Sequence, residues 1–545
     1  MGHHTILGYW DGGDIRPEPY EKIIAAALQE VREPVYLIEQ NGSIHIAHHG
    51  NVHLSPLERP ETAQPLVAVV PPLTPESLGD PDLKAALGVR YAYVVGAMAN
   101  AITSVDMVEA AGRAGAIGFF GAAGLDVTAI EQAAVELKRR GENMPYGFNL
   151  IHSPGDPELE FKTVELYLDH GIKLISASAY MDLTPPLVYY RLKGIHRDPS
   201  GTVVCPNRIV GKISREEVAR RFFSPPPVKI VDRLVEQGLI SRTEADLSPF
   251  VPMADIVTAE ADSGGHTDNR PALTLLPTIL ALRNQMADKH GFTTPLHVGL
   301  GGGIATPSAA AAAFSMGAAY VLTGSINQAC VEAGTSDTVR KMLAEAGQAD
   351  VAMAPAADMF EMGVKVQVLK RGTMFPLKAA KLYDLYTRHP NYASIPEKER
   401  MALERDYFRC SFDEQWRRTR RFFETRDPSQ IEKAAADPRH KMALVFRSYL
   451  GQSSNWANSG EPTRQMDYQV WCGPSIGAFN AWTKGTLLER TDNRHTAEVA
   501  MNLMLGAATL LRASQLTVQG VALPRHALDY PPKPLSEIRK LMGTT

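Results

Sequence analysis

The sequence has few cysteines, and their spacing excludes several common frameworks. Its 545 residues include only Cys205, Cys330, Cys410 and Cys472, which lie far apart, and no pair has CxxC spacing. We therefore expect neither a disulfide framework nor a zinc or other metal site. This sparse use of cysteine favours a reducing cytoplasm.

Long apolar runs and a strong net charge are also missing. The most apolar stretch, 309–320, is too short and too broken by glycine to span a bilayer. The first residues, MGHHTILGYWDGG, lack the apolar core of a secretory signal. The formal net charge is −4, so no basic field points to nucleic acid. We expect no membrane partner and no nucleic-acid partner.

What the sequence does contain is the composition of a folded protein with a large core. Hydrophobic residues make up 44% and charged residues 21% of the chain. These fractions are typical of globular and not of disordered proteins. A chain of this length exceeds one ordinary domain, so we expect one large domain with appendages.

Short apolar runs alternate with amphipathic stretches between residues 88 and 335. Runs with little internal alternation are typical of strands buried on both faces, as in parallel sheets. Eight such runs, each followed by a crossover, predict a closed (β/α)₈ TIM barrel. An open doubly wound sheet would carry GxGxxG after its first strand, and Gly96-Ala-Met-Ala-Asn100 does not fit that pattern. The eight runs are 92–95, 116–120, 146–150, 174–176, 208–212, 256–259, 296–299 and 320–322.

The remaining segments are interpreted as additions to the barrel. Residues 1–87 are expected to form an α+β segment, with a hairpin between 36–40 and 43–47 turning at Asn41-Gly42. Residues 213–252 are expected to form a helical insertion between the fifth and sixth strands. Residues 336–545 are rich in charge and poor in strand-like runs, so we expect an α-helical C-terminal region.

Two consecutive glycine-rich loops predict a phosphate site. After the seventh run, Gly301, Gly302 and Gly303 precede Thr306 and Pro307, which suit the first turn of a helix. After the eighth run come Thr323, Gly324 and Ser325. Glycine lets backbone N–H groups approach an anion, and barrels often bind phosphate with these two loops. The alternative is that the glycines only make tight turns.

The loop after the sixth run combines carboxylates, glycines and a histidine. It reads Glu260-Ala-Asp-Ser-Gly-Gly-His266-Thr-Asp-Asn-Arg270. Gly264 and Gly265 would let the backbone lie against a flat ring, and His266 is suited to donating a hydrogen bond or a proton near neutral pH. The alternative is a histidine that only satisfies a hydrogen bond within its loop.

These motifs together resemble those of the nitronate monooxygenase (2-nitropropane dioxygenase-like) flavoprotein superfamily, over about residues 88–335. The residues that carry the resemblance are 96–100, Gly147-Phe-Asn149, the loop of His266, 301–304 and 323–325. The run from Ala261 to Pro271 and the long C-terminal region are more specifically similar to PfaD-type trans-acting enoyl reductases of polyunsaturated fatty acid and polyketide synthases. One departure is Asp262-Ser-Gly-Gly-His266, where the related fatty-acid-synthesis enzymes carry Glu-Ala-Gly-Gly-His.

The resemblance implies an FMN enzyme with NADPH or NADH as reductant. Gly96, Ala97 and Met98 would line the flavin ring, Asn149 and Lys212 would contact the ring or ribityl chain, and Gly302, Gly303, Gly324 and Ser325 would hold the phosphate. His266 would take the place of the active-site histidine and donate to the thioester oxygen or supply a proton. The implied substrate is an enoyl thioester on an acyl carrier protein, and we expect a homodimer.

Several alternatives stay open at this stage. Trp416-Arg-Arg-Thr-Arg-Arg421 is either a basic patch for an acidic carrier or a solvated helix face paired with Glu414 and Glu424. The chain as a whole is alternatively a nitronate monooxygenase, a phosphate-binding barrel without flavin, or a non-enzymatic scaffold of a synthase.

Overall fold

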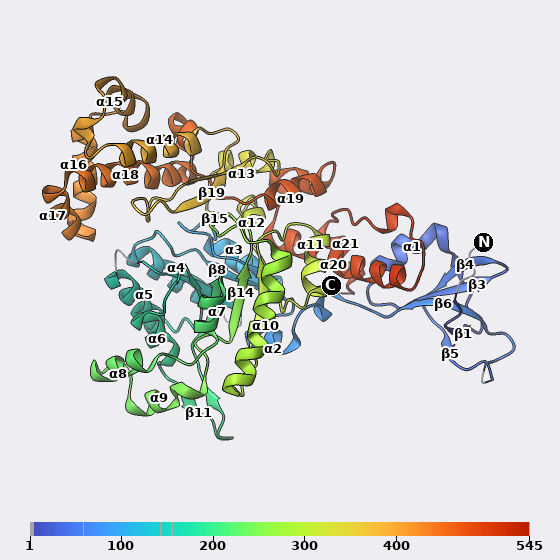
Figure 1. The fold of residues 1–545 in the computed structure, drawn as a ribbon. Coiled ribbons are helices and arrows are strands. Elements are labelled where there is room, and N and C mark those ends of the chain that lie inside the picture. Colours follow the sequence, from blue (N-terminus) through green and yellow to red (C-terminus); the bar gives the residue numbers. More distant parts are fainter. Residues whose placement is uncertain (1–4, 58, 142–143, 154–156, 544–545) are drawn as a thin grey trace.

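A closed barrel of eight parallel strands forms the centre of the computed structural model, which describes residues 5–57, 59–141, 144–153 and 157–543 (Figure 1). The strands follow one another round the barrel in chain order. Each lies within two residues of its expected limits, so the predicted (β/α)₈ barrel is confirmed. They are β7 (Tyr93–Val95), β8 (Ile117–Phe120), β9 (Tyr146–Ile151), β10 (Leu174–Ser178), β13 (Arg208–Ile213), β14 (Ile256–Glu260), β16 (His297–Gly301) and β17 (Val321–Thr323).

Successive residues of a barrel strand enter two different apolar layers. Val94 and Ile256 belong to one buried cluster, whereas their neighbours Tyr93 and Val257 belong to the larger cluster that includes the surrounding helices. Burial on both faces explains why the runs in the sequence are apolar throughout. Helix α2 (Pro81–Leu87), which begins at the strand starts, contributes Leu83 to the first cluster.

Helices follow the strands and cover the barrel. Pro185 and Pro186 occupy the first turn of α6 after the N-cap Thr184, so they start that helix and do not break it. Three helices occupy the expected insertion after β13. The helices are α3 (Val105–Arg113), α4 (Val127–Arg140), α5 (Pro157–Asp169), α6 (Pro185–Leu192), α7 (Glu216–Phe222), α8 (Val228–Glu236), α9 (Arg242–Leu247), α10 (Ala272–His290), α11 (Pro307–Ser315) and α12 (Ser325–Gln328), and a small β11 (His196–Arg197) and β12 (Val203–Val204) ladder follows α6.

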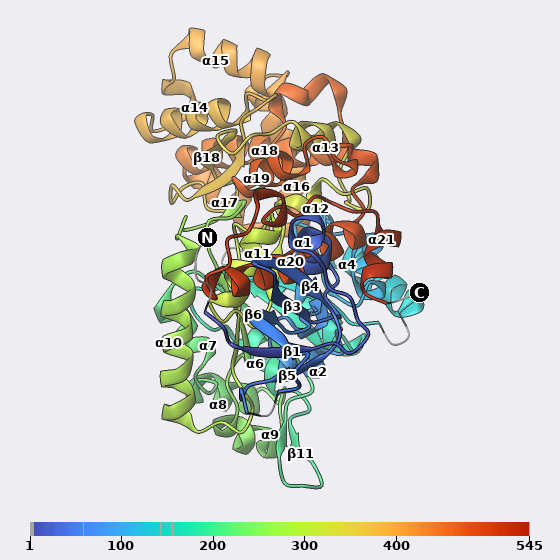
Figure 2. The ribbon, with the colours of Figure 1, turned by 90° about the vertical axis from the view of Figure 1, so that its right-hand side faces the viewer.

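The N-terminal segment is a six-stranded sheet with one helix, on which Figure 2 looks directly. The expected hairpin is present: Gln40 pairs with Ser43, and Asn41 and Gly42 have φ of 52° and 79°, as a tight two-residue turn requires. The elements are β1 (Gly8–Asp11), β2 (Glu18–Pro19), α1 (Tyr20–Gln29), β3 (Val35–Gln40), β4 (Ser43–Ala47), β5 (Asn51–His53) and β6 (Gln64–Val70).

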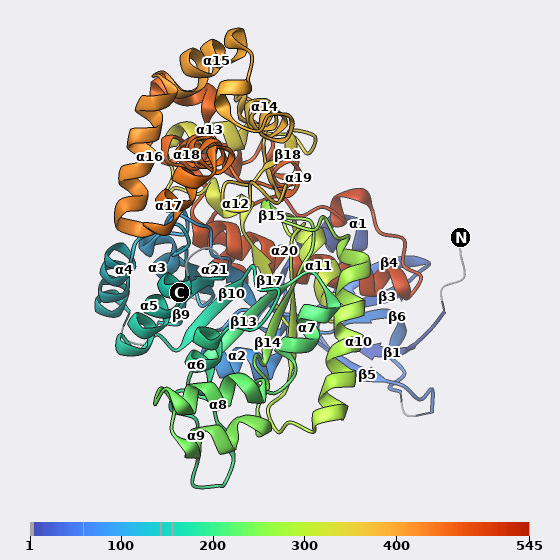
Figure 3. The ribbon, with the colours of Figure 1, turned by 60° about the vertical axis from the view of Figure 1, so that its left-hand side comes forward.

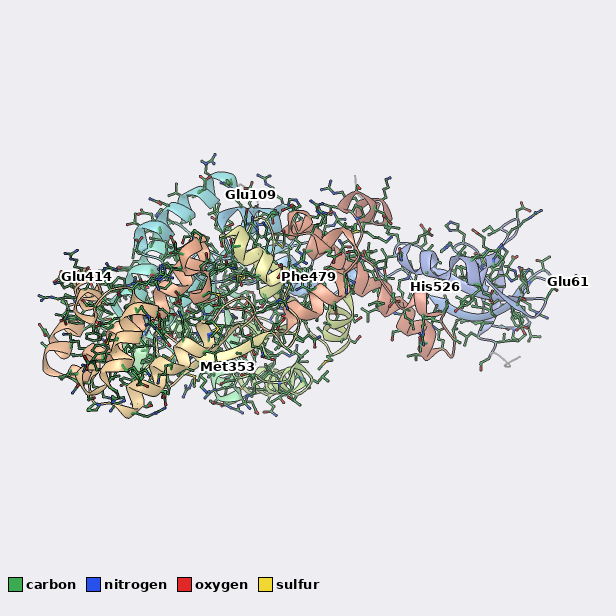
Figure 4. The ribbon with its side chains drawn as sticks, turned by 90° about the horizontal axis from the view of Figure 1, so that it is seen from above. Glu61, Glu109, Met353, Glu414, Phe479 and His526 are labelled. Carbon is green, nitrogen blue, oxygen red and sulfur yellow. The ribbon has the colours of Figure 1, made fainter. Side chains whose placement is uncertain are left out.

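The long helix α20 (Thr496–Val518) joins this sheet to the barrel. Its buried residues pack against α11, and the guanidinium of Arg512 donates to the backbone oxygens of Glu30 and Glu33 at 2.6 and 2.7 Å. Figure 4 shows the resulting elongated molecule, with Glu61 of the N-terminal segment and Glu414 at opposite ends. No helix within the described ranges is long and apolar enough to cross a membrane.

The C-terminal region is mostly helical, as expected, but two strands lie within it. β18 (Val351–Pro355) and β19 (Lys365–Leu369) pair with each other, and β19 pairs with β15 (Gly265–His266) of the barrel loop. These two strands were not predicted, because their runs lie in a region dominated by helical patterns. The helices are α13 (Asp337–Ala344), α14 (Phe375–Arg388), α15 (Glu397–Leu403), α16 (Phe412–Arg426), α17 (Ser429–Ala436), α18 (Pro438–Ser459), α19 (Ser475–Thr483) and α21 (Leu535–Leu541).

Candidate functional site

The predicted site residues all lie on one face of the barrel. Parallel strands end at the same side, so residues on or just after their carboxyl ends share that face. Helices α13, α14 and α18 lie above it (Figures 1 and 3). The residues brought there are Gly96, Ala97, Met98, Asn149, Lys212, Gly264, Gly265, His266, Gly301, Gly302, Gly303, Thr323, Gly324 and Ser325.

The loop after β16 has the local geometry that its sequence predicts. Thr306 caps α11 by accepting the N–H of Ala309 at 3.2 Å, and Pro307 occupies the first turn. Gly302 and Gly303 have φ of 83° and 78°. A Cβ on Gly302 would lie 2.7 Å from the carbonyl of Ala261, whereas one on Gly303 would meet no atom within 4 Å. Gly302 therefore allows close packing against Ala261, and Gly303 leaves its backbone accessible to a ligand.

The three predicted residues at and after the end of β17 differ in burial. Thr323 is buried, and its hydroxyl donates to the hydroxyl of Tyr93 at 2.8 Å. Gly324 is open, because a Cβ there would meet nothing within 4 Å. The hydroxyl of Ser325 accepts the N–H of Gly473 at 3.0 Å, so the C-terminal region contacts this loop.

The loop after β7 is held in a strained conformation. Asn100 and Ala101 both have φ of 56°, a region that residues other than glycine rarely adopt. Two contacts stabilise the loop: the buried Thr103 hydroxyl donates to Gly96 O at 2.8 Å, and the Asn100 amide donates to Ser454 Oγ of α18 at 2.9 Å. Met98 also donates its N–H to Thr103 at 2.9 Å. Backbone strain of this kind is concentrated at functional sites.

Two further polar side chains project from the ends of strands. The amide of Asn149 on β9 is buried and donates to Ser176 O and Ser178 Oγ at 2.9 and 3.1 Å. Lys212 on β13 forms an ion pair with Glu260 on β14, with Nζ and Oε1 2.7 Å apart. Strand pairing therefore places a paired ammonium and carboxylate next to the loop of His266.

The loop of His266 is built jointly by the barrel and the C-terminal region. Its backbone pairs with β19, so that His266 lies opposite Val366. The imidazole Nε2 lies 3.2 Å from Oδ1 of Asp358. Burial lowers the pKa of His266, but Asp358 and Glu260 outweigh it, so the pKa is raised above its usual value. The same contact keeps the pKa of Asp358 below its usual range, against the opposing effect of burial.

The second glycine pair repeats the division seen after β16. A Cβ on Gly264 would lie 2.7 Å from the backbone of Cys472, whereas one on Gly265 would meet nothing within 4 Å. The side chain of Gln367 donates to Asp262 Oδ1 and to Ser263 O, both at 2.8 Å. The C-terminal region thus fixes both the backbone and the ring of this loop.

Four residues that contact the site loops were not identified from the sequence: Asp358, Gln367, Cys472 and Gly473. They lie about 90 to 210 residues from the loops they contact, and none belongs to a motif with a mechanism of its own. Only the pairing of β15 with β19 brings the first two to the site.

The arrangement fits a flat cofactor with an anionic tail. Gly265, Gly303 and Gly324 leave open backbone on one face, where their N–H groups can meet a ring or a phosphate. Lys212 adds a cationic donor near the strand ends, where the Asn149 amide is held by Ser176 and Ser178. Two surface hollows, of about 410 and 510 Å³, lie elsewhere, one beside Tyr20 and His526 and the other between α4 and α5. Their linings contain none of the predicted site residues, so neither hollow is the candidate site.

Part of the C-terminal region matches a known family model. Residues 389–468, from the end of α14 to just beyond α18, match the family described as [acyl-carrier-protein] S-malonyltransferase, inserted helical domain. This match covers a minor part of the chain and does not include the barrel.

Relatives of known name match most of the chain. It is 43% identical over 496 residues to one component of the polyunsaturated fatty acid synthase of Thraustochytrium sp., covering 90% of this chain and 32% of that protein. It is 43% identical over 458 residues to polyketide biosynthesis protein PksE of Bacillus subtilis, and the match covers 84% of this chain and 59% of that protein. The chain therefore spans about one third and three fifths of the length of these two curated relatives.

A solved structure matches over nearly its whole length. The enoyl reductase domain of MlnA, from the macrolactin biosynthesis cluster of Bacillus amyloliquefaciens, is 40% identical with a TM-score of 0.78. The match covers 81% of this chain and 99% of that domain.

Proposed function

This chain belongs to the enoyl reductase family of polyketide and polyunsaturated fatty acid synthases that includes the MlnA domain, and from this premise we propose that it is an FMN-dependent, trans-acting enoyl-[acyl-carrier-protein] reductase. The observation that carries the proposal is the 40% identity over 99% of the MlnA enoyl reductase domain. The convergence of the glycine loops and His266 on one barrel face supports it.

The proposed reaction converts a 2-enoyl thioester into the saturated thioester. The C2=C3 double bond becomes a single bond, a hydride is added at C3 and a proton at C2, and one NADPH or NADH is oxidised. Bound FMN supplies the hydride relay between the nicotinamide and the substrate. Negative charge develops on the thioester oxygen as C3 accepts the hydride.

The residues proposed to hold FMN divide into two groups. Backbone N–H groups at Gly301, Gly302, Gly303, Gly324 and Ser325 would bind the phosphate, helped by the N-terminus of α11. The ring and ribityl chain would lie against Gly96, Ala97, Met98, Asn149, Lys212, Gly264 and Gly265.

His266 is the proposed proton or hydrogen-bond donor to the substrate. Its raised pKa increases the protonated fraction near neutral pH, which suits a donor to a developing negative charge. Removal of the donor by His266→Ala should lower turnover while FMN is retained. A turnover within a few-fold of the unmodified enzyme would remove His266 from the mechanism.

The proposed partner is an acyl carrier protein that carries the enoyl group, and the proposed assembly is a homodimer in the cytoplasm. The family matching residues 389–468 is named for a carrier-dependent malonyltransferase, which is consistent with such a partner. Arg417 pairs with Glu414, and Arg420 pairs with Glu424, so each already has a partner on α16, and these two glutamates offset half of the charge of the four arginines in the run. We therefore expect charge reversal at these two arginines to have little effect on carrier-bound substrate. A selective loss with carrier-bound substrate would instead assign the docking surface to α16.

The test is anaerobic reduction of a crotonyl thioester on an acyl carrier protein and on pantetheine, with NADPH or NADH. We expect a flavin spectrum and a product that is two hydrogens heavier by mass spectrometry.

Gly303→Asp should lose the flavin, because a carboxylate would oppose the phosphate. Gly291→Asp is the matched control, since Gly291 also has positive φ and open space but caps the far end of α10. Oxygen uptake with a nitronate and no enoyl reduction would make the protein a nitronate monooxygenase, and a colourless protein would exclude a flavin enzyme.

A further inference from the structure

We propose that Asp358 of the C-terminal region is the positioning residue of His266, orienting its imidazole and favouring its proton-donating form. The inference rests on the proposed function for its catalytic consequence. The contact between the two side chains is independent of that function.

The carboxylate of Asp358 faces the ring directly. Oδ1 lies 3.2 Å from Nε2 of His266 and also accepts the N–H of Met359 at 3.0 Å. In the part of the chain that the structure describes, Nδ1 of His266 has no hydrogen-bond partner. A carboxylate that accepts from one ring nitrogen fixes the orientation of the imidazole and leaves the other nitrogen to meet a substrate.

The segment carrying Asp358 is itself held in place. Arg447 of α18 donates from Nε to Ala357 O at 2.8 Å and pairs through Nη1 with Glu361 Oε1 at 3.2 Å. The carboxylate, whose side chain is 53% exposed, is therefore presented by a braced loop between β18 and β19.

The backbone of His266 is fixed from the same region. β15 pairs with β19, and Gln367 bonds to Asp262 and Ser263 at the start of the loop. The ring and the backbone are thus both held by the same small sheet and its connecting loop. A histidine held in this way needs little reorganisation when charge develops on a substrate.

Three charged groups act on the imidazole from different elements. Asp358 and Glu260 of β14 favour the protonated form, and Lys212 of β13 disfavours it. Burial also disfavours protonation. Because Glu260 is already paired with Lys212, Asp358 is the carboxylate whose removal should change the titration of His266 most.

The experiment is a titration of the imidazole in full-length, FMN-containing protein labelled with ¹³C at histidine Cε1, with His266 assigned by His266→Gln. We expect Asp358→Asn to lower the pKa of His266 and Asp358→Glu to restore it in part. Glu361→Gln is the matched control, because it neutralises a carboxylate of the same loop that contacts Arg447 and not His266. We expect it to leave the titration unchanged.

Kinetics provide the second readout. If protonated His266 is the donor, kcat/KM falls as pH rises through its pKa, so Asp358→Asn should move that fall to lower pH. At pH 8 we expect a loss of roughly 3–10-fold in kcat/KM for a crotonyl pantetheine thioester, with unchanged FMN affinity.

An unchanged His266 titration in Asp358→Asn, or an equal change in Glu361→Gln, would overturn the positioning role. A shifted titration with an unshifted pH profile would remove its catalytic consequence and thus overturn the proposal. Absence of enoyl reduction in the unmodified enzyme would contradict the proposed function alone, because the titration does not depend on turnover.

Discussion

The loops after β16 and β14 each contain a glycine pair, but they are stabilised in different ways. In each pair one glycine packs against backbone, Gly302 on Ala261 and Gly264 on Cys472, and the next glycine is open. The loop after β16 continues into a helix capped by its own Thr306. The loop of His266 instead pairs with a strand about 100 residues away in the chain.

The loop after β16 is thus held mainly by residues close to it in the chain, whereas the loop of His266 is held by residues of the C-terminal region. The loop after β16, the proposed phosphate loop, is shaped mainly by its own glycines and by the Thr306 cap. The histidine loop acquires its conformation only when the C-terminal region lies on the barrel face. We therefore expect mutations in the first loop to affect mainly FMN binding, and mutations in the second to affect turnover more than FMN binding.

Gly302→Ala should have the largest effect, because Gly302 links the two loops. Its Cβ would lie 2.7–2.8 Å from backbone atoms of Ala261 and Asp262, at a φ of 83°. We expect the free energy of unfolding to fall by about 3 kcal/mol and FMN to be lost. Denaturant unfolding and flavin content measure both. Gly303→Ala is the control, with similar φ but no clash, and should cost about 1 kcal/mol. Equal stability losses in the two variants would show that the packing of Gly302 is unimportant.

Gly264→Ala should act on the assembled loop and leave the phosphate loop intact. The Cβ would lie 2.7–2.9 Å from the backbone of Cys472, so the C-terminal segment must move. We expect a loss of about 2 kcal/mol in unfolding free energy, a large fall in kcat and a smaller loss of FMN affinity than in Gly302→Ala, because Gly264 is proposed to lie near the ring and not the phosphate. Flavin fluorescence quenching and steady-state kinetics separate the two effects. Loss of FMN as severe as in Gly302→Ala would erase the distinction between the loops.

Gln367→Ala removes the side-chain contacts between β19 and the histidine loop without adding bulk. Three hydrogen bonds are lost from a side chain that is almost fully buried: two of 2.8 Å that Gln367 donates, and one of 3.3 Å that it accepts from Asn269. We expect about 1.5 kcal/mol of destabilisation and a several-fold lower kcat. Thermal unfolding and single-turnover reduction of the enoyl thioester report these quantities. An unchanged kcat would mean that backbone pairing alone holds His266.

Thr306→Ala should have the smallest effect and should be confined to the phosphate loop. It removes the N-cap of α11, at a cost of about 1 kcal/mol. FMN affinity should weaken slightly, while the titration of His266 stays as in the unmodified protein. Thr306→Ser, which keeps the hydroxyl, is the matched control. A changed histidine titration would show that the cap of α11 also acts on His266, through the packing of Gly302 on Ala261.

Sequence patterns predicted much of the fold because barrel strands are buried on both faces and carry a continuous apolar signal. The hairpin at Asn41-Gly42 and the cap at Thr306 were likewise predictable, since each depends on residues within one turn of the chain. β18 and β19 were missed: their five-residue runs lie in a region dominated by helical patterns. Asp358 was missed because an isolated aspartate carries no signal without its partner.

The order of chain elements by itself determined the barrel and the shared face of its loops, because parallel strands joined by helices must all end on one side. Local chemistry likewise determined the glycine turns and the helix caps. Only the tertiary structure decided which carboxylate faces His266 and which backbone packs on Gly264. Those contacts join residues about 90 to 210 positions apart, and their geometry depends on how the C-terminal region lies on the barrel.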